Sequence, residues 1–293
     1  MSIVKSVRVA TDFSEPAGWA VDRAASVIRA AGLDHGSLVH ALDSHRVRAV
    51  RDLLPVLAGL ERDLTESAEK SLTKDVARVE QATGVKLAPK MVEGDVAGAL
   101  LQEAGADDLL VIGAKGATNA RDVILGSTAE KVVRRSDSPV LVVRNKVAGD
   151  YARLVVAMDF SEDSKAALRF AAAVAPAARI YLVHAFMPLP RTPQIQAPIS
   201  EEDIARYDEA VKKQAAERMD AVIRECGVDE DRVEPVMDYG NAPLVIREKA
   251  QAVDAELIVV GRHGEHKFKD WLLGSVTNNI LNSSSRDVLV VKA

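Results

Sequence analysis

The segment Leu109–Gly116 reads LLVIGAKG, and the segment Leu257–Gly264 reads LIVVGRHG. In each segment, an apolar run typical of a buried strand leads directly into a glycine, two further residues and a second glycine. Nine residues after that second glycine, each copy continues with Gly-Ser, at Gly126-Ser127 and at Gly274-Ser275. The chain therefore carries the pattern Gly-x2-Gly-x9-Gly-Ser twice.

The repetition extends well beyond these glycines. Three blocks recur in the same order and at a nearly constant offset: Val7–Glu15 (VRVATDFSE) on Leu154–Glu162 (LVVAMDFSE), Leu38–Ala41 on Leu182–Ala185, and 111–143 on 259–291 without a gap. This order indicates two copies of one unit, each of domain size. We predict a first domain at residues 1–147 and a second at 148–293, joined where Gly149 and Asp150 interrupt the apolar pattern.

Each copy alternates apolar strand-like runs with helical stretches. Expected strands are 6–10, 37–41, 85–92, 108–112 and 140–143 in the first copy, and about 153–157, 179–185, 232–237, 256–260 and 288–291 in the second. Helical stretches are expected at 15–31, 47–82, 96–104 and 125–136, and a long helix of the second copy near Ser200, after a proline-rich loop. Continuous apolar strands between helices predict an α/β fold with a parallel sheet covered on both faces. Ligands of such doubly wound sheets bind beyond the carboxyl ends of the strands.

The glycine pattern follows the predicted fourth strand of each copy, where a ligand would bind. Glycine tolerates positive φ and lets the backbone approach a ligand closely. The Gly-Ser pair opens a helix, whose N-terminus favours phosphate groups, and the serine can cap that helix or donate its hydroxyl. If the nine-residue spacer folds back, the two glycine sites form a phosphate cradle. The simpler alternative is a pair of tight strand–helix turns.

Two further residue pairs recur beside these glycines. Asp12 and Asp159 end the first strand of each copy, where a carboxylate can accept hydrogen bonds from ribose or adenine, or can instead cap the next helix together with Ser14 or Ser161. His40 and His184 end the second strand, and this placement is more typical of a satisfied core residue than of a catalyst.

Composition narrows the functional classes. The chain has 293 residues, a net charge of −5 and 4% aromatic residues, which disfavours nucleic acid as a partner. Its single cysteine, Cys226, excludes an internal disulfide. No signal peptide and no apolar stretch long enough to span a membrane are visible, so we expect a cytoplasmic protein without membrane contact. P-loop, dinucleotide-binding, metalloenzyme and nucleophile-elbow motifs are missing from the sequence.

The strand ending in Asp-Phe-Ser-Glu, the Leu-Val-His-Ala strand and the Gly-x2-Gly-x9-Gly-Ser signature resemble the universal stress protein family, over nearly the whole chain. The resemblance implies two Rossmann-like or flavodoxin-like domains, each a five-stranded parallel sheet of order 3-2-1-4-5. Family members with the intact signature bind ATP. The resemblance assigns adenosine contacts to Asp12 and Asp159, adenine contacts to the main chain at Ala41 and Ala185, and phosphate contacts to Gly113, Gly116, Gly126, Ser127, Gly261, Gly264, Gly274 and Ser275. A magnesium ion would bridge the phosphates.

The resemblance also implies a role and an assembly. We expect an ATP-binding module for stress response or signalling, with an unknown protein partner, no assigned catalytic residue and at most slow ATP hydrolysis. The two domains would pair through their last strands, Val140–Val143 and Val288–Val291, as a pseudo-dimer within one chain, and further homodimerisation is compatible with this. Two alternatives stay open: a pseudo-dimer that binds no nucleotide, and an enzyme that transfers nucleotidyl groups.

The two copies differ around the signature. Its third position is Lys115 in the first copy and His263 in the second. The helix after Gly-Ser is charged in the first copy (Glu130, Lys131, Arg134, Arg135) and neutral in the second (Asn278, Asn279, Asn282). These differences allow two sites of unequal affinity. The cations Lys115, Arg121, Arg262, Lys267 and Lys269 lie near enough in sequence to reach phosphates, although solvated surface charges are the simpler interpretation.

Overall fold

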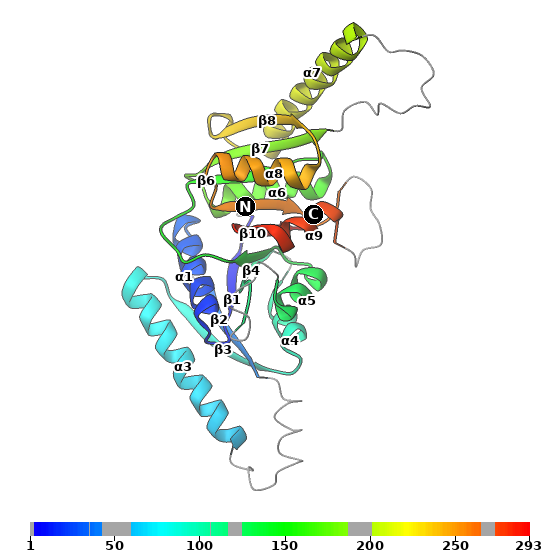
Figure 1. The fold of residues 1–293 in the computed structure, drawn as a ribbon. Coiled ribbons are helices and arrows are strands. Elements are labelled where there is room, and N and C mark those ends of the chain that lie inside the picture. Colours follow the sequence, from blue (N-terminus) through cyan, green and yellow to red (C-terminus); the bar gives the residue numbers. More distant parts are fainter. Residues whose placement is uncertain are drawn as a thin grey trace.

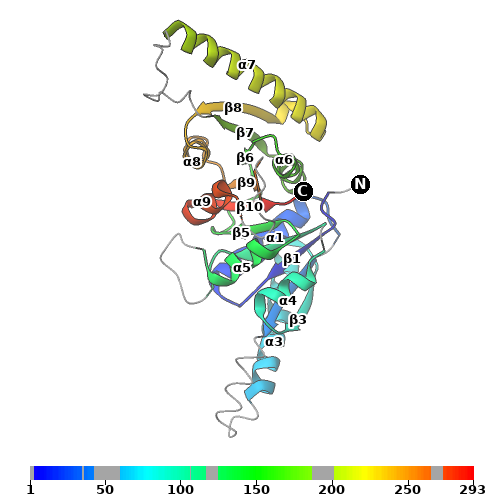
Figure 2. The same cartoon turned by 90° about the vertical axis from the view of Figure 1, so that its right-hand side faces the viewer.

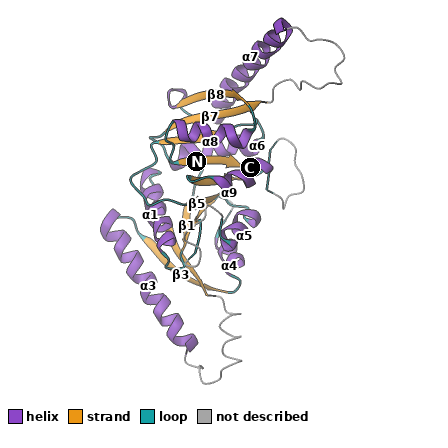
Figure 3. Cartoon of the chain, viewed as in Figure 1, coloured by secondary structure: helices purple, strands orange, loops and turns teal. Residues whose placement is uncertain are grey.

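The computed structural model describes residues 3–34, 36–42, 60–105, 107–116, 125–186, 201–264 and 273–293. The proline-rich loop of the second copy and the two nine-residue spacers therefore fall mostly outside the described residues, as do Arg121, Lys267 and Lys269. The described part is a central sheet with helices on both sides (Figures 1 and 3).

All ten described strands form one sheet, in the order β3-β2-β1-β4-β5-β10-β9-β6-β7-β8. Their bounds are β1 Ser6–Ala10, β2 Gly36–Leu42, β3 Leu87–Glu93, β4 Asp108–Gly113, β5 Val140–Val143, β6 Arg153–Ala157, β7 Arg179–Phe186, β8 Val233–Tyr239, β9 Leu257–Gly261 and β10 Asp287–Val291. Each half is a parallel five-stranded sheet of the expected order 3-2-1-4-5. The expected α/β fold is confirmed.

The two halves join through their last strands. β5 and β10 pair in antiparallel fashion, with Leu141 opposite Leu289. The expected pseudo-dimer is therefore confirmed, and it merges two parallel sheets into one mixed sheet. Because β5 and β10 run in opposite directions, the carboxyl ends of the strands lie at one edge of the sheet in the first half and at the opposite edge in the second.

The helices divide between the two faces of this sheet. Their bounds are α1 Glu15–Ala30, α3 Leu60–Thr83, α4 Val96–Glu103, α5 Ser127–Arg135, α6 Glu162–Val174, α7 Glu201–Cys226, α8 Ala242–Ala252 and α9 Ser275–Ser283. One apolar core lies under α1, α3, α6 and α7, and the other lies under α4, α5, α8 and α9. In Figure 2, α6 lies on one side of β6–β10, and α8 and α9 lie on the other. The long helices α3 and α7 lie at opposite ends of the molecule (Figure 1).

Successive residues within a strand alternate between the two cores. In β4, Leu109 and Val111 belong to the core beneath α1, whereas Leu110 and Ile112 belong to the core beneath α4 and α5. A strand buried on both faces needs apolar residues at every position, which explains the continuous apolar runs in the sequence.

The segment that links the two halves is fixed by a buried polar cluster. Tyr151 donates its hydroxyl to Asp287 Oδ2 at 2.7 Å, and the Arg23 guanidinium lies over the Tyr151 ring, 3.8 Å from its centre. Burial raises the pKa of the Asp287 carboxyl, whereas the hydrogen bonds it accepts from Arg144 and Tyr151 act in the opposite direction. These contacts tie the linker to α1 of the first half and β10 of the second. The exact domain boundary at 147/148 stays a prediction.

Among the described residues, no helix is long and apolar enough to cross a membrane.

Candidate functional site

The turn after the first strand of each half has the same unusual backbone. Phe13 and Phe160 adopt left-handed conformations, with φ of 61° and 68°. This bend lets Ser14 and Ser161 cap α1 and α6, because their hydroxyls accept hydrogen bonds from Ala17 N and Ser164 N. The serines are therefore the caps of these helices.

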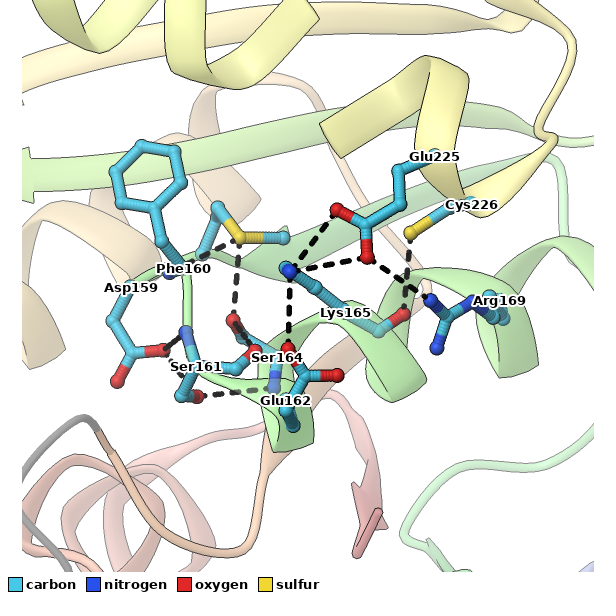
Figure 4. A network of polar contacts seen from close by, with 10 residues as sticks. Asp159, Phe160, Ser161, Glu162, Ser164, Lys165, Arg169, Glu225 and Cys226 are labelled. Atoms are coloured by element: carbon cyan, nitrogen blue, oxygen red, sulfur yellow. Dashed lines mark hydrogen bonds and ion pairs between the residues drawn. The ribbon is translucent and has the colours of Figure 1, made fainter. Parts of the chain in front are cut away.

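The aspartates that precede these serines have a different role. Asp159 Oδ1 accepts hydrogen bonds from the backbone N–H of Ser161 at 3.1 Å and from its hydroxyl at 2.6 Å, as Figure 4 shows. Asp12 makes the same two contacts with Ser14. One carboxylate oxygen thus orients the capping serine, and the other lies against the glycine turn.

The second glycine of each signature packs directly on this carboxylate. A Cβ atom on Gly116 would lie 2.7 Å from Asp12 Oδ2, and one on Gly264 would lie 2.7 Å from Asp159 Oδ2. A side chain at either position would therefore require the carboxylate to move. Positive φ is one expected use of the signature glycines, but none of the six adopts it. Their requirement is close approach.

The Gly-Ser pair lies back against the first glycine turn. Gly126 N donates to Ala114 O at 2.8 Å, and Gly274 N donates to Arg262 O at 2.9 Å. The two glycine sites of each copy therefore meet, as the cradle requires. Gly126 and Gly274 are themselves the N-caps of α5 and α9, without a side-chain cap bond. Of the two roles considered for Ser127 and Ser275, the structure excludes helix capping, and donation of the hydroxyl to a phosphate stays a prediction.

The first glycine of each signature has a packing reason of its own. A Cβ atom on Gly113 would lie 3.1 Å from Pro16 O, and one on Gly261 would lie 2.9 Å from the carbonyl carbon of Asp163. The end of the fourth strand thus touches the first turn of α1 or α6. These two glycines allow the strand and the helix to pack tightly, in addition to any ligand contact.

All twelve predicted site residues line two cavities, one per half. The first cavity measures about 380 Å³ and the second about 790 Å³, within the usual range for small-molecule sites. The first cavity contains Asp12, Ala41, Gly113, Gly116, Gly126 and Ser127, and the second contains Asp159, Ala185, Gly261, Gly264, Gly274 and Ser275. Apolar side chains complete the walls, among them Val96 and Leu100 in the first and Ala242 and Ile246 in the second. Each cavity thus offers apolar walls, a carboxylate and a helix N-terminus.

The paired histidines have structural partners. His40 Nδ1 lies 2.8 Å from Thr11 O, and its ring lies 4.5 Å from that of Phe13. His184 repeats the arrangement with Met158 O and Phe160. These contacts hold the left-handed turn in place, and they support the core-residue interpretation over catalysis.

Figure 4 also shows the polar contacts that join α6 to the end of α7. Lys165 forms ion pairs with Glu162 and Glu225, and Cys226 contacts Lys165 O. Burial raises the pKa of the Cys226 thiol, which favours the unreactive protonated form. This agrees with a packing role for the single cysteine.

The two described cations within the glycine signatures, Arg262 and Lys115, have different surroundings. Arg262 is 4% exposed, and its guanidinium donates to the carbonyls of Ser136 and Arg134 at the end of α5. It is neither a solvated surface charge nor a phosphate ligand, but a contact between the two halves. Lys115 lines the first cavity.

The structure adds residues to the second cavity that sequence reasoning did not assign to it. Arg134 lines this cavity although it belongs to the first half, and its Nη2 lies 3.3 Å from Asn278 Oδ1. His263 also lines the cavity, and Asp163 on α6 lies 3.3 Å from its Nδ1. The sequence signal for Asp163 is a difference between the copies at the start of this helix, where the first copy has Pro16.

Comparison with known proteins assigns the family. The universal stress protein family model matches residues 4–144 and again 150–292. The chain therefore belongs to the universal stress protein family, as a member with two such domains in tandem.

Known relatives agree with this assignment, and a solved structure has the same fold. Universal stress protein MJ0577 of Methanocaldococcus jannaschii is 27% identical over 163 residues, which cover 50% of this chain and 99% of that protein. Universal stress protein Rv2624c of Mycobacterium tuberculosis is 33% identical over 159 residues, which cover 52% of this chain and 57% of that protein. The crystal structure of a universal stress protein from Archaeoglobus fulgidus has the same fold, with a TM-score of 0.71 over 98% of both chains and 20% identity.

Proposed function

We propose that this universal stress protein binds ATP in both cavities and acts as a nucleotide-dependent module in stress response or signalling. The observation that carries the proposal is the convergence, in each half, of the carboxylate after the first strand, the end of the second strand and the folded-back glycine signature around one cavity. Adenine would lie near the main chain of Ala41 or Ala185. The phosphates would lie on the N-terminus of α5 or α9, where unpaired N–H groups favour anions.

Magnesium would accompany the triphosphate. A nucleotide brings its own oxygen ligands for this ion, and Mg²⁺ typically keeps several waters in such sites. We assign no protein ligand to it.

The first test is chemical. Protein purified without added nucleotide is denatured, and the released small molecules are separated and identified. We expect adenine nucleotide. If none is released, and if Mg-ATP neither gives a calorimetric signal nor raises the melting temperature, the nucleotide-free pseudo-dimer is the better description. A ligand at about 100 times its Kd should stabilise the fold by about 2.7 kcal/mol.

Two valine variants locate the sites. Gly126→Val and Gly274→Val each place a branched side chain against the preceding glycine turn, where a Cβ atom would already lie 3.3 or 3.2 Å from a carbonyl oxygen. Each should remove binding at one cavity and halve the stoichiometry, and the double variant should not bind. Gly18→Ala is the control, because no atom lies within 4 Å of the added carbon. An unchanged stoichiometry in either single variant would contradict the assignment of that site.

A further inference from the structure

His263 and Asp163 form a pair at the wall of the second cavity. His263 Nδ1 lies 3.3 Å from Asp163 Oδ2, and the backbone N–H of His263 donates to the same oxygen at 2.9 Å. Both side chains are enclosed, with 9% and 6% of their surfaces exposed. Asp163 is in turn fixed by the backbone N–H of Ala293, which donates to its other oxygen at 3.0 Å. The imidazole is therefore held in one orientation.

This orientation leaves the other ring nitrogen unused. A carboxylate accepts but cannot donate, so the proton of a neutral His263 lies on Nδ1. Nε2 is enclosed and has no hydrogen-bond partner among the described residues. Buried polar atoms of this kind are rare in native proteins, and each calls for an explanation such as a ligand.

The pair occurs in the second half alone. The first half has Lys115 at the position of His263 and Pro16 at the position of Asp163. A flexible ammonium group thus replaces a fixed imidazole, and the first half has a proline instead of a carboxylate at the position of Asp163.

Charged side chains from three parts of the fold surround this imidazole. In the described part of the chain, Asp159 after β6 and Arg134 on α5 line the same cavity, and Asp163 on α6 is in direct contact with the ring. Arg262, the next residue along the chain, is engaged with the end of α5. An anion that enters the cavity would find Arg134 and His263 as its cationic or potentially cationic partners.

We propose that His263, positioned by Asp163, binds the phosphate chain of a nucleotide in the second cavity and takes up a proton as it does so. The inference rests on the proposed ATP binding. A neutral Nε2 would present a lone pair to a phosphate oxygen and repel it. A protonated imidazole donates from both nitrogens, to Asp163 and to phosphate, and such charge-assisted hydrogen bonds are the strong ones.

Calorimetry on the full chain tests the proposal. In the Gly126→Val background, in which the first cavity is closed, Mg-ATP is titrated in two buffers of different ionisation enthalpy. We expect the apparent enthalpy to differ between buffers by an amount that corresponds to net proton uptake. Affinity should also fall as the pH is raised, because binding is coupled to proton uptake.

Substitutions test whether the proton taken up on binding goes to the pair of His263 and Asp163. His263→Gln should weaken ATP binding about 10- to 100-fold, remove the proton uptake and leave adenosine binding unchanged. Asp163→Asn should retain the shape of the pair and lower both ATP affinity and proton uptake. Lys115→Gln, measured in the Gly274→Val background, is the matched control and should alter no proton uptake. A separate readout on the wild-type chain is the imidazole NMR signal of His263, which should move to that of the doubly protonated ring when ATP is added.

The outcomes separate the two proposals. If the Gly126→Val protein binds no ATP, the function proposed for the second cavity fails. If it binds ATP without proton uptake, with His263→Gln unchanged in affinity and the imidazole signal unmoved, the role of His263 is overturned while ATP binding stands.

Discussion

The Ser161 side chain both caps α6 and holds Asp159 of the candidate site. Its hydroxyl accepts from Ser164 N and donates to Asp159 Oδ1. Ser161→Ala should lower the free energy of unfolding by about 1 kcal/mol, as loss of an N-cap typically does. It should also weaken nucleotide binding in the second cavity, because Asp159 loses one of the two hydrogen bonds from Ser161 that orient it.

Denaturant unfolding and calorimetry measure these two effects. Ser14→Ala is the matched variant, and its binding defect should appear in the first cavity alone. Equal defects at both cavities from either substitution would show that the serines act through general stability rather than through their aspartates.

The end of α5 lies beside the cavity of the other half. The strands of the two halves run in opposite directions, so α5, which starts at the carboxyl edge of its own sheet, ends near the carboxyl edge of the second. Arg262 fastens this end through the carbonyls of Ser136 and Arg134. Arg134 belongs to the first copy in the sequence, but its positive charge therefore lies at the second cavity.

Arg134→Gln should therefore weaken ATP binding in the second cavity several-fold and leave the first unchanged. Its side chain is partly exposed, so the expected change in stability is small. Arg135→Gln is the control, because Arg135 is more exposed, pairs with Asp95 and does not line the cavity. Site-specific calorimetry in the two valine backgrounds would measure the effect, and a defect in the first cavity instead would contradict the crossing arrangement.

The linker should give the fold a measurable pH dependence. The hydrogen bond from Ser26, followed by the contacts with Arg29, lowers the pKa of the Asp150 carboxyl. A carboxyl whose pKa is lower in the folded state stabilises the fold above its unfolded pKa of about 3.9, and loses this contribution as the pH falls through the folded value. Asp150 is about half exposed, so we expect less than about 1 kcal/mol.

Asp150→Asn should reduce stability at pH 7, and the loss should become smaller at pH 3, because the contribution of the native carboxyl fades as the pH falls toward its lowered pKa. Urea unfolding at both pH values checks this. An equal loss of stability at both would assign the effect to packing instead of charge.

The sequence predicted the fold well because both faces of the sheet are buried. Apolar residues such as Leu109 and Leu110 are required at successive positions, and the duplication shows the same pattern twice. The sequence also predicted which residues line the cavities. It did not predict why glycine stands at the signature positions, because the contact of Gly116 with Asp12 Oδ2 joins residues far apart in the chain. His263 drew attention as a difference between the copies, but its partner Asp163 lies a hundred positions earlier, and no local pattern connects them.

The pairing of β5 with β10 joins the two halves into one sheet. Both apolar cores continue across this junction. A fragment of residues 1–147 would expose β5 as an edge strand with apolar residues on both sides, which is a template for pairing with another chain. We predict that this fragment self-associates through β5 into a dimer that resembles the intact chain.

Light scattering over a range of concentrations tests this prediction. The fragment should show a concentration-dependent dimer, and its melting temperature should rise with concentration. The full chain, in which β10 already covers β5, is the control and should not show this particular dependence. A monomeric fragment as stable as the full chain would contradict the prediction.

The covalent link between the halves has a consequence for how the two sites can change over time. In a dimer of identical subunits, every mutation appears in both sites at once, so neither can be altered alone. Here one site has the histidine–aspartate pair and an arginine from across the junction, whereas the other has a lysine and a proline. Gene duplication followed by fusion thus turns a symmetric assembly into one in which each half can be selected separately, with the shared sheet holding the geometry constant.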